Sequence, residues 1–315
     1  MGKAPQVLVI TGPTATGKTA LSVALALELD GEVVSADSMQ LYRRMDIGTA
    51  KPTAEEMCGV PHHMLSVADP WEEYSVSRYV EAASACVEDI LARGKMPILV
   101  GGTGLYIDSL LSGRDFAGKG GGALREALGT EYDAVGGEAM LEKLAAFDPE
   151  RAAKLHPGDK RRIVRAIEIY RLTGQTITQH DAETGRLPPR WTSVKIALSF
   201  QNREALYTRI DRRVDRMMEQ GLLEEVRALL ADGVPDGSTA LQAIGYKELI
   251  AALRGDCSVD EAVEAIKRGS RRYAKRQLTW LRRDAALRWI LWEREPELAE
   301  GVRLSTKYIR AGVVE

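Results

Sequence analysis

The sequence predicts an α/β fold, in which a P-loop core built on a parallel sheet carries a mostly helical insertion and a helical C-terminal part. Three observations lead to this class. Short apolar runs typical of buried strands alternate with helical patterns in the first half of the chain, as in parallel sheets with crossover helices. A glycine-rich phosphate-binding pattern directly follows the first of these runs. From about residue 114 to residue 190, no comparable strand run occurs.

Four apolar runs are the expected strands of the sheet. They lie at residues 7–10, 33–34, 98–100 and 194–200. We therefore expect three parts: the first part of the P-loop core at residues 1–114, the helical insertion at residues 115–191, and the completion of the core with basic C-terminal helices at residues 192–315. The glycine cluster Gly118–Gly122 is expected to be a flexible entry to the insertion, and Pro188 and Pro189 mark its exit.

The pattern after the last expected strand is helical. One helical stretch is expected over residues 203–230 and another from about residue 259 to residue 284. Ser258 and Glu261 have the spacing of a capping box at the start of the second stretch. The residues after Trp292 show no pattern from which structure can be predicted.

The composition is that of an ordinary globular enzyme, with 315 residues of which 45% are hydrophobic and 28% are charged. Because the formal net charge is only −2, any RNA-binding surface must come from local charge. The three cysteines form no C-x-x-C pair, which argues against a disulfide framework or a zinc finger. We find no signal-peptide pattern and no apolar run of membrane-spanning length, and we expect a cytoplasmic protein without a membrane partner.

The run from residue 12 to residue 19 satisfies the P-loop pattern between a strand and a helix. It consists of Gly12, Pro13, Thr14, Ala15, Thr16, Gly17, Lys18 and Thr19. In such a turn, backbone N–H groups point at an anion and the helix N-terminus adds partial positive charge. Lys18 is expected to reach the outer phosphate, and the Thr19 hydroxyl is expected to ligate Mg²⁺. Because nucleotide-binding and ATP-binding proteins share this pattern, it indicates only a phosphorylated ligand.

Two further strand ends carry side chains that suit a reaction. Asp37 follows the second strand, which places its carboxylate at the edge of the sheet where open α/β folds bind ligands. The third strand ends in the turn Gly101–Tyr106, which allows close backbone approach and offers the hydroxyl of Thr103. A small-metabolite P-loop kinase could use both features, so at this point kinase and transferase remain open.

Several longer segments carry a resemblance to a known family. They are Ser35–Tyr42, Met45–Pro52, Pro61–His63, Gly101–Tyr106, Leu241–Glu248 and Lys275–Arg282. Together with the P-loop, they make nearly the whole chain resemble the bacterial tRNA dimethylallyltransferases, also called tRNA isopentenyltransferases. That family transfers a dimethylallyl group from dimethylallyl diphosphate to N6 of an adenine next to the anticodon in tRNA, and releases diphosphate. The resemblance implies Mg²⁺ as cofactor, and dimethylallyl diphosphate and the tRNA anticodon loop as partners; we expect a monomer.

The chemistry of that reaction agrees with the residues present. The lone pair of an adenine N6 is delocalised into the ring, so a carboxylate that accepts its proton is useful, and Asp37 is the expected general base. Its alternative role is to orient Mg²⁺-bound water, as in small kinases. Arg213 matches the family's phosphate-binding arginine, shares a helix face with Arg209 and Arg216, and would stabilise the leaving diphosphate with Lys18. We assign Asp37, Thr103 and Arg213 as catalytic.

Two basic runs predict an RNA-binding surface, one around Lys160–Arg165 and one from Lys267 to Arg283. A solvated helix face is the alternative for both. The resemblance implies that the following residues bind tRNA: Asp37, Ser38, Met39, Gln40, Thr103, Arg125, Arg161, Arg162, Ile163, Val164, Arg165, Leu241, Gln242, Ala243, Ile244, Gly245, Tyr246, Lys275, Arg276, Gln277 and Arg282. The chain departs from the family at Arg161, where glutamine is common, and in the glycine-rich linker.

Other roles remain open for three side chains and for the chain as a whole. Gln40 could read a base edge or cap a loop through its amide. His62 and His63 lack supporting ligands at metal-binding spacing, so we expect packing or loop hydrogen bonds from them. Besides the kinase, a prenyltransferase acting on free adenine nucleotides is an alternative, although it would not need the two basic runs. A pure RNA-binding protein would leave the P-loop and Asp37 unexplained.

Overall fold

The structure is a computed structural model that describes residues 6–113, 122–185 and 187–311. The chain divides into two compact units. The first combines Met1–Leu111 with Trp191–Glu315, and the second is Ser112–Arg190. We call them the P-loop unit and the helical unit and describe each by itself. Gly118–Gly121 of the expected linker lie outside the described residues.

The P-loop unit is built on one sheet of six parallel strands in the order β3-β2-β4-β1-β5-β6. The strands are β1 (Val7–Thr11), β2 (Gly31–Ser35), β3 (His62–His63), β4 (Met96–Gly101), β5 (Ser193–Phe200) and β6 (Arg288–Trp292). The predicted α/β class with a parallel sheet is confirmed, as are the four strands expected from apolar runs. Strands β3 and β6 were not expected, because a two-residue strand and a run with alternating burial at the sheet edge give weak signals.

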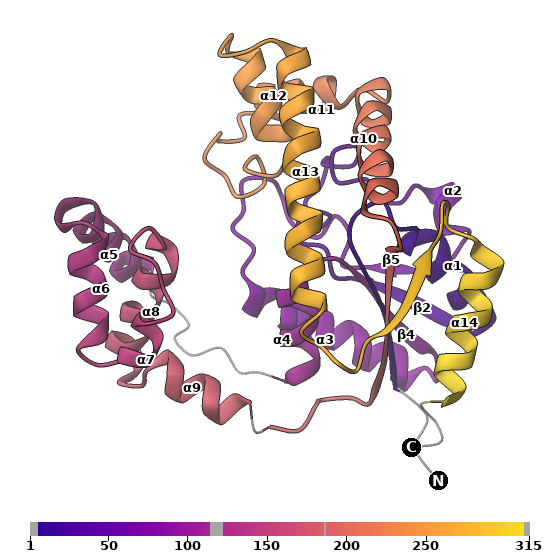
Figure 1. Ribbon diagram of the computed structural model, residues 1–315, viewed down its shortest axis with the longest axis horizontal. Helices are drawn as coiled ribbons and strands as arrows, with labels where there is room; N and C mark the ends of the chain where they lie inside the picture. The colour runs from indigo at the N-terminus through magenta and orange to yellow at the C-terminus, as the bar shows by residue number, and fades with distance from the viewer. Residues whose placement is uncertain (1–5, 114–121, 186, 312–315) are drawn as a thin grey trace. The chain divides into compact units, whose positions relative to one another are not determined.

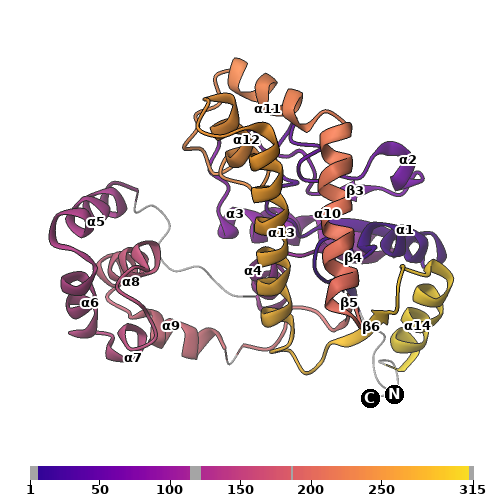
Figure 2. The ribbon, with the colours of Figure 1, turned by 45° about the horizontal axis from the view of Figure 1, so that its top comes forward.

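Nine helices of the described residues belong to the P-loop unit. They are α1 (Lys18–Glu28), α2 (Ala54–Met57), α3 (Val76–Ala92), α4 (Gly104–Ser112), α10 (Arg203–Glu219), α11 (Leu222–Ala231), α12 (Tyr246–Leu253), α13 (Val259–Leu281) and α14 (Leu298–Ala311). Helices α1 and α14 lie side by side on one side of the sheet, and α3 and α4 lie on the other (Figure 1). Helices α10 and α13 run next to each other (Figure 2). The capping box between Ser258 and Glu261 starts α13 as expected.

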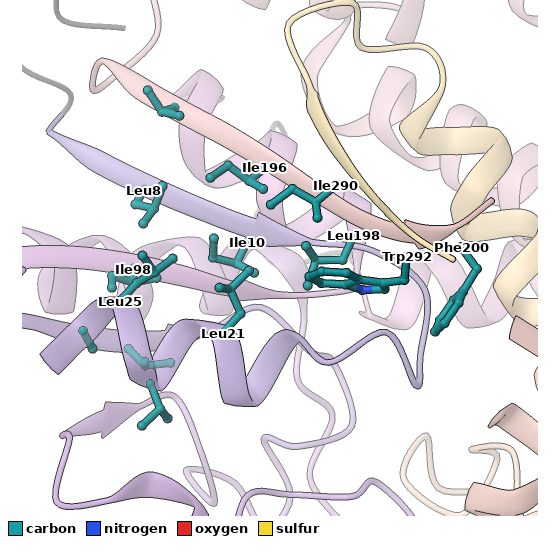
Figure 3. Close-up of a cluster of buried hydrophobic side chains, with 14 of the residues drawn as sticks. Leu8, Ile10, Leu21, Leu25, Ile98, Ile196, Leu198, Phe200, Ile290 and Trp292 are labelled. Atoms are coloured by element: carbon teal, nitrogen blue, oxygen red, sulfur yellow. The ribbon is translucent and has the colours of Figure 1, made fainter. Parts of the chain in front are cut away.

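The core of the P-loop unit lies between the sheet and α1. Leu8 and Ile10 of β1 and Leu21 and Leu25 of α1 are almost completely buried there. Figure 3 shows these side chains together with Trp292, which lies next to Leu198. Successive side chains of a strand point to opposite faces of the sheet, so Leu8 and Ile10 both point into this cluster. Their packing against α1 holds the P-loop, which connects β1 to α1, in a fixed position.

The expected helical stretch over residues 203–230 is two helices. Helix α10 ends at Glu219 and α11 starts at Leu222, with Gly221 between them at a φ of 97°. Such a φ is favourable only for glycine, so the chain turns here although the apolar pattern continues on both sides. Helix α14 was not expected at all.

The helical unit contains five helices in its described residues: α5 (Gly122–Val135), α6 (Gly137–Ala145), α7 (Pro149–Ala152), α8 (Lys160–Thr173) and α9 (Ile177–Thr184). It has its own apolar core, in which Ile163 and Ile167 of α8 pack with Leu128 of α5 and Met140 of α6. The apolar residues of α8 have the spacing of a helix with one buried face. This face packs against the other helices of the unit and forms its core.

Candidate active site

The P-loop has the geometry of an anion cradle. Gly17 adopts a φ of 85° and caps α1, and Gly12 has a φ of 142°. A Cβ atom on Gly12 would lie 2.4 Å from the carbonyl oxygen of Leu198, so only glycine fits beside β5. The Thr16 hydroxyl donates to the carbonyl of Pro13 at 2.9 Å, which tightens the turn. The cradle is thus fixed by its own residues before any ligand binds.

A cavity of about 580 Å³ opens beside this cradle within the P-loop unit. Its lining includes six of the eight P-loop residues, Thr14 to Thr19. It also includes Asp37 and its neighbours to Gln40, the loop residues Gly48 to Ala50, and Arg209 and Arg213 of α10. Helix α13 contributes Tyr273, Arg276 and Gln277. The strand ends, α10 and α13 therefore surround one space that contains a phosphate cradle, a carboxylate and cations.

Lys18 and Arg213 face the same carboxylate across this cavity. The Lys18 Nζ atom donates to the carbonyl oxygens of Gly12 at 3.0 Å and Pro13 at 2.7 Å. Burial, and to a lesser degree the positive charge of Arg213, lower the pKa of Lys18 to about 7, while the negative charge of Asp37 opposes the shift. Burial also lowers the pKa of Arg213, and Asp37 again opposes it. Two positive charges are held close together, as a site for a highly charged anion requires.

Asp37 is held in a tight turn after β2. Its Oδ1 atom accepts from the backbone N–H of Met39 at 2.9 Å and from that of Gln40 at 3.4 Å. The backbone N–H of Ser38 donates to the Thr103 hydroxyl at 3.1 Å, and the Thr103 N–H donates to the carbonyl of Ala36 at 3.1 Å. The ends of β2 and β4 therefore bring Asp37 and Thr103 together, as expected for adjacent parallel strands.

Tyr273 and Gln277 of α13 complete this end of the cavity. The Gln277 amide donates to the carbonyl of Gly102 at 2.9 Å, which ties α13 to the turn after β4. Burial, followed by the charge of Asp37, raises the pKa of Tyr273 to about 12, so its hydroxyl stays protonated. Tyr273 was not among the expected site residues. No local sequence pattern reveals its place beside Asp37, because the two residues lie far apart in the chain.

The amide of Gln40 is used within the chain. Its Oε1 atom accepts from the Ser35 hydroxyl at 3.1 Å, and its Nε2 atom donates to the carbonyls of Thr49 at 3.3 Å and Ala50 at 3.2 Å. Gln40 therefore has the geometry of a loop-capping amide, which is one of its two expected roles.

The chain is similar to known proteins over most of its length. A family model described as IPP transferase matches residues 40–284, and one described as isopentenyl transferase matches residues 5–67. A tRNA dimethylallyltransferase of Caldanaerobacter subterraneus subsp. tengcongensis is 48% identical over 286 residues, covering 90% of this chain and 91% of that protein. A tRNA dimethylallyltransferase 1 of Pelobacter propionicus is 49% identical, covering 91% of this chain and 92% of that protein.

Solved structures are similar over comparable lengths. The crystal structure of a tRNA isopentenylpyrophosphate transferase from Bacillus halodurans is 40% identical with a TM-score of 0.72, covering 97% of each chain. A eukaryotic dimethylallyltransferase acting on tRNA is 33% identical with a TM-score of 0.75, covering 87% of this chain and 69% of that one. The chain belongs to the tRNA dimethylallyltransferase family.

The basic residues of α13 in this tRNA dimethylallyltransferase family member differ in whether they form ion pairs. Lys267 pairs with Asp215 at 2.7 Å and Arg271 pairs with Asp211, so α10 neutralises both. The remaining basic side chains of α13 and its C-terminal cap are exposed and form no ion pair with another described residue. They are Arg268, Arg272, Lys275, Arg276 and Arg282. The basic run is thus divided into a paired row and an unpaired row.

The expected tRNA-binding residues of this family member differ in exposure. Ile163, Val164, Leu241 and Tyr246 are buried, with at most 4% of each residue's surface exposed. Arg161, Arg162 and Gln242 are exposed. The others of the segment Leu241–Tyr246 lie partly or fully within the unit: Ala243 and Ile244 are half-buried and Gly245 is buried. The side chains of the buried members therefore do not lie at the surface of the unit.

Two arginines of the helical unit converge on one buried carboxylate. Glu168 of α8 has no exposed surface, and its Oε2 atom accepts from Arg125 at 3.0 Å and from Arg165 at 2.8 Å. Arg125 is 51% exposed and Arg165 is 32% exposed, so the buried Glu168 carboxylate holds two arginine side chains that both reach the surface of the helical unit. Glu168 was not expected from the sequence, because an acid on the apolar face of a helix gives no distinctive pattern.

His62 and His63 form strand β3, and only His62 makes the expected local hydrogen bond; His63 contacts a carboxylate of the neighbouring strand β2. His62 Nδ1 lies 2.8 Å from the carbonyl of Val60, and His63 Nε2 lies 2.8 Å from Glu32. Within the described residues there is no cluster of three or more potential metal-ligating side chains. No helix in the described part of the chain is long and apolar enough to cross a membrane.

Proposed function

We propose that this protein transfers a dimethylallyl group from dimethylallyl diphosphate to N6 of an adenine next to the anticodon of tRNA, and releases diphosphate. The observation that carries the proposal is the convergence of the P-loop, Lys18, Arg213 and Asp37 on one cavity. It rests also on membership of the tRNA dimethylallyltransferase family. A small-metabolite kinase would share the cradle but would not need a row of unpaired cations on α13 or the helical unit.

In the proposed reaction, the bond between the allylic carbon and the diphosphate oxygen breaks and a bond from N6 to that carbon forms. Negative charge grows on the leaving oxygens, where Lys18, Arg213 and the P-loop N–H groups stabilise it. The N6 proton passes to Asp37, whose Oδ1 atom is oriented by two backbone N–H groups. Thr103 holds the turn of Ser38 next to Asp37.

The residues present fit a bound Mg²⁺ ion. This ion takes few protein ligands and keeps water and phosphate oxygens, and the Thr19 side chain lines the cavity next to Lys18. Thr19 would hold the ion together with the diphosphate, and the ion would supply further neutralisation of the leaving group.

The acceptor RNA is proposed to bind along the unpaired cations of α13 and on the arginines of the helical unit, with the target adenine splayed out of its loop. We further propose that the helical insertion of residues 115–191 serves tRNA contact while the rest of the chain carries the reaction, and that the protein acts as a cytoplasmic monomer.

The test is incubation of the protein with bulk tRNA, dimethylallyl diphosphate and Mg²⁺, followed by mass spectrometry of the tRNA nucleosides. We expect one adenosine derivative heavier by a five-carbon prenyl group, located next to the anticodon. A Lys18→Ala variant is the control and should give little product. Alkylation of free adenine nucleotides without tRNA, or phosphate transfer from ATP to a small alcohol, would contradict the proposal.

A further inference from the structure

The loop after Met45 is fastened by a single carboxylate. The backbone N–H groups of Asp46, Ile47 and Gly48 donate to Glu225 of α11 at 2.9, 2.8 and 3.1 Å. The first two donate to Oε2 and the third to Oε1. Three successive N–H groups directed at one charged acceptor hold a loop more firmly than neutral hydrogen bonds would. The loop belongs to the segment Met45–Pro52, for which the sequence offered no chemical interpretation.

Tyr246 supports the same carboxylate from α12. Its hydroxyl donates to Glu225 Oε1 at 2.6 Å, and the residue has no exposed surface. Burial, and then the charge of Glu225, raise the pKa of Tyr246 well above its usual range, so the hydroxyl remains a donor. A Cβ atom on Gly48 would lie 2.5 Å from the Tyr246 ring, so the loop fits against the ring only because residue 48 is glycine. We call Glu225 and Tyr246 the loop clamp.

The other side of the clamped loop meets the candidate active site. Gly48, Thr49 and Ala50 line the cavity. The carbonyl of Thr49 accepts from Gln40 Nε2 and, at 3.5 Å, from Arg213 Nη2. The Thr49 hydroxyl donates to the carbonyl of Met45 at 2.6 Å, which closes the loop on itself. The clamp is therefore connected to Arg213 through one short, internally bonded loop.

We propose that Glu225 and Tyr246 are positioning residues for the donor half of the reaction, acting through the Thr49 carbonyl on Arg213. This rests on the proposed function, in which Arg213 stabilises the leaving diphosphate. An arginine has five donors in a fixed planar arrangement, so the position of one acceptor decides where the others point. If the loop moved, Arg213 would lose its backbone acceptor. Its guanidinium group would then no longer be held where the proposed leaving diphosphate needs it.

The test starts from Glu225→Gln, which puts an NH₂ group where one oxygen now accepts hydrogen bonds. We expect kcat/KM for dimethylallyl diphosphate to fall about 10- to 100-fold, as is typical when a supporting contact of a site residue is lost. The affinity for tRNA in filter binding should stay within about twofold, because Glu225 is not among the expected tRNA-binding residues and its hydrogen bonds are to the loop and to the buried Tyr246 hydroxyl. Glu224→Gln is the matched control: it removes the same charge from the neighbouring exposed residue, which pairs with Arg227 instead.

A mutant cycle distinguishes positioning from general damage. In an Arg213→Ala background, Glu225→Gln should lower kcat/KM for the donor by less than about threefold, since its effect passes through Arg213. Equal effects of Glu225→Gln with and without Arg213 would overturn the proposal. Should Glu225→Gln fold poorly, Tyr246→Phe replaces it, with an expected loss of about three- to tenfold. An unchanged donor constant in Tyr246→Phe would then also overturn the proposal.

Donor binding measured by calorimetry with dimethylallyl diphosphate alone separates this inference from the proposed function. If the wild type does not alkylate tRNA but Glu225→Gln still weakens donor binding, the proposed acceptor is wrong and the clamp stands. If the wild type alkylates tRNA and Glu225→Gln behaves as Glu224→Gln does, the clamp is wrong and the function stands.

Discussion

At the scale of single residues, the cavity combines groups whose charges depend on one another. Lys18 and Arg213 repel each other, and Asp37 attracts both. A bound diphosphate would offset the repulsion between the two cations, because its negative charge attracts both. Among the described residues, Asp37 is the acid that acts on both cations, so the proposed base lies beside the groups that would hold the leaving diphosphate.

Asp37→Asn should lower turnover by about two to four powers of ten while both substrates still bind. An amide oxygen can keep the hydrogen bonds from Met39 and Gln40, so the turn should persist, but an amide does not accept the N6 proton. The measurement is single-turnover product formation at saturating tRNA and donor. Near-normal rates would remove Asp37 from the role of base.

Donor binding should weaken as pH rises through about 7, the pKa to which burial and Arg213 lower Lys18. The sign follows because the diphosphate needs the protonated amine: below the pKa the free protein already carries that proton, and above it binding must take one up. Calorimetry at pH 8 in buffers of different ionisation enthalpy should show net proton uptake. Lys18→Arg, whose side chain stays charged, should abolish most of it; equal uptake in both proteins would assign the proton elsewhere.

At the scale of elements, α13 carries two rows of basic residues that differ in their ion pairs. Its row of Lys267 and Arg271 is fastened to acids of α10, whereas the row with Arg272 and Lys275 is exposed and without ion pairs among the described residues. The paired row joins α13 to α10, and the unpaired row is the part of α13 that we propose to bind tRNA.

Neutralising Arg272 and Lys275 together to glutamine should weaken tRNA binding and reduce the slope of log affinity against log salt by about one to two units, at 0.7 to 0.9 per lost phosphate contact. Salt titration by filter binding gives the slope. Lys307 and Arg310 are exposed cations on α14, and their double glutamine variant is a control of equal charge. An equal change of slope in both variants would mean that only net charge matters.

Much of each element could be predicted from the sequence because its cause is local. The strand, glycine turn and helix of the P-loop, the capping box at Ser258 and the apolar face of α8 all depend on residues a few positions apart. Other features depend on partners far along the chain. Trp292, which closes β6, donates from its ring to the carbonyl of Thr16 at 3.0 Å, and no local pattern indicates this support of the P-loop.

The candidate site shows the same limit. Asp37, Lys18 and Arg213 were expected from motifs, and the cavity brings them together. The roles of Glu225 and Glu168 could not be predicted in full, because each acts on a group that is distant in sequence: Glu225 on the loop of residues 46–48, and Glu168 on Arg125 of α5. The second partner of Glu168, Arg165, lies only three residues away on the same helix. Tyr246 lies in an expected tRNA-binding segment, and only the fold reveals that its hydroxyl faces Glu225.

At the scale of the whole molecule, the buried Glu32 joins strand β2 to strand β3 and to the chain between α3 and β4. Glu32 of β2 accepts from His63 of β3 at 2.8 Å and from Arg93 after α3 at 2.8 Å, and lies 3.3 Å from Lys95. Hydrogen bonding to Arg93 is the largest effect that lowers the pKa of Glu32 to about 2.

Because the folded pKa lies below the ordinary value, this carboxylate contributes stability that is present above about pH 4.5 and lost as pH falls towards 2. Glu32→Gln should lower the free energy of unfolding by about 1 to 3 kcal/mol at pH 7. Urea unfolding at a series of pH values should show this difference shrinking below pH 4.5. A difference that does not change with pH would mean that the substitution acts through packing.

The strand order has a consequence for how the chain is made. Leu8 of β1 lies opposite Ile98 of β4 on one side and Val194 of β5 on the other. Because β5 follows the helical unit in the chain, β1 can pair with β5 only after the helical unit has been synthesised. At about 5 to 20 residues per second, nearly 200 residues take about 10 to 40 seconds to synthesise. During that interval the apolar run Val7–Thr11 has an open edge, while the helices of residues 122–185 need only near neighbours in sequence and can complete their own core. We therefore expect the helical unit to fold before the P-loop unit. We also expect the nascent strand of residues 7–11 to be a binding site for chaperones at the ribosome.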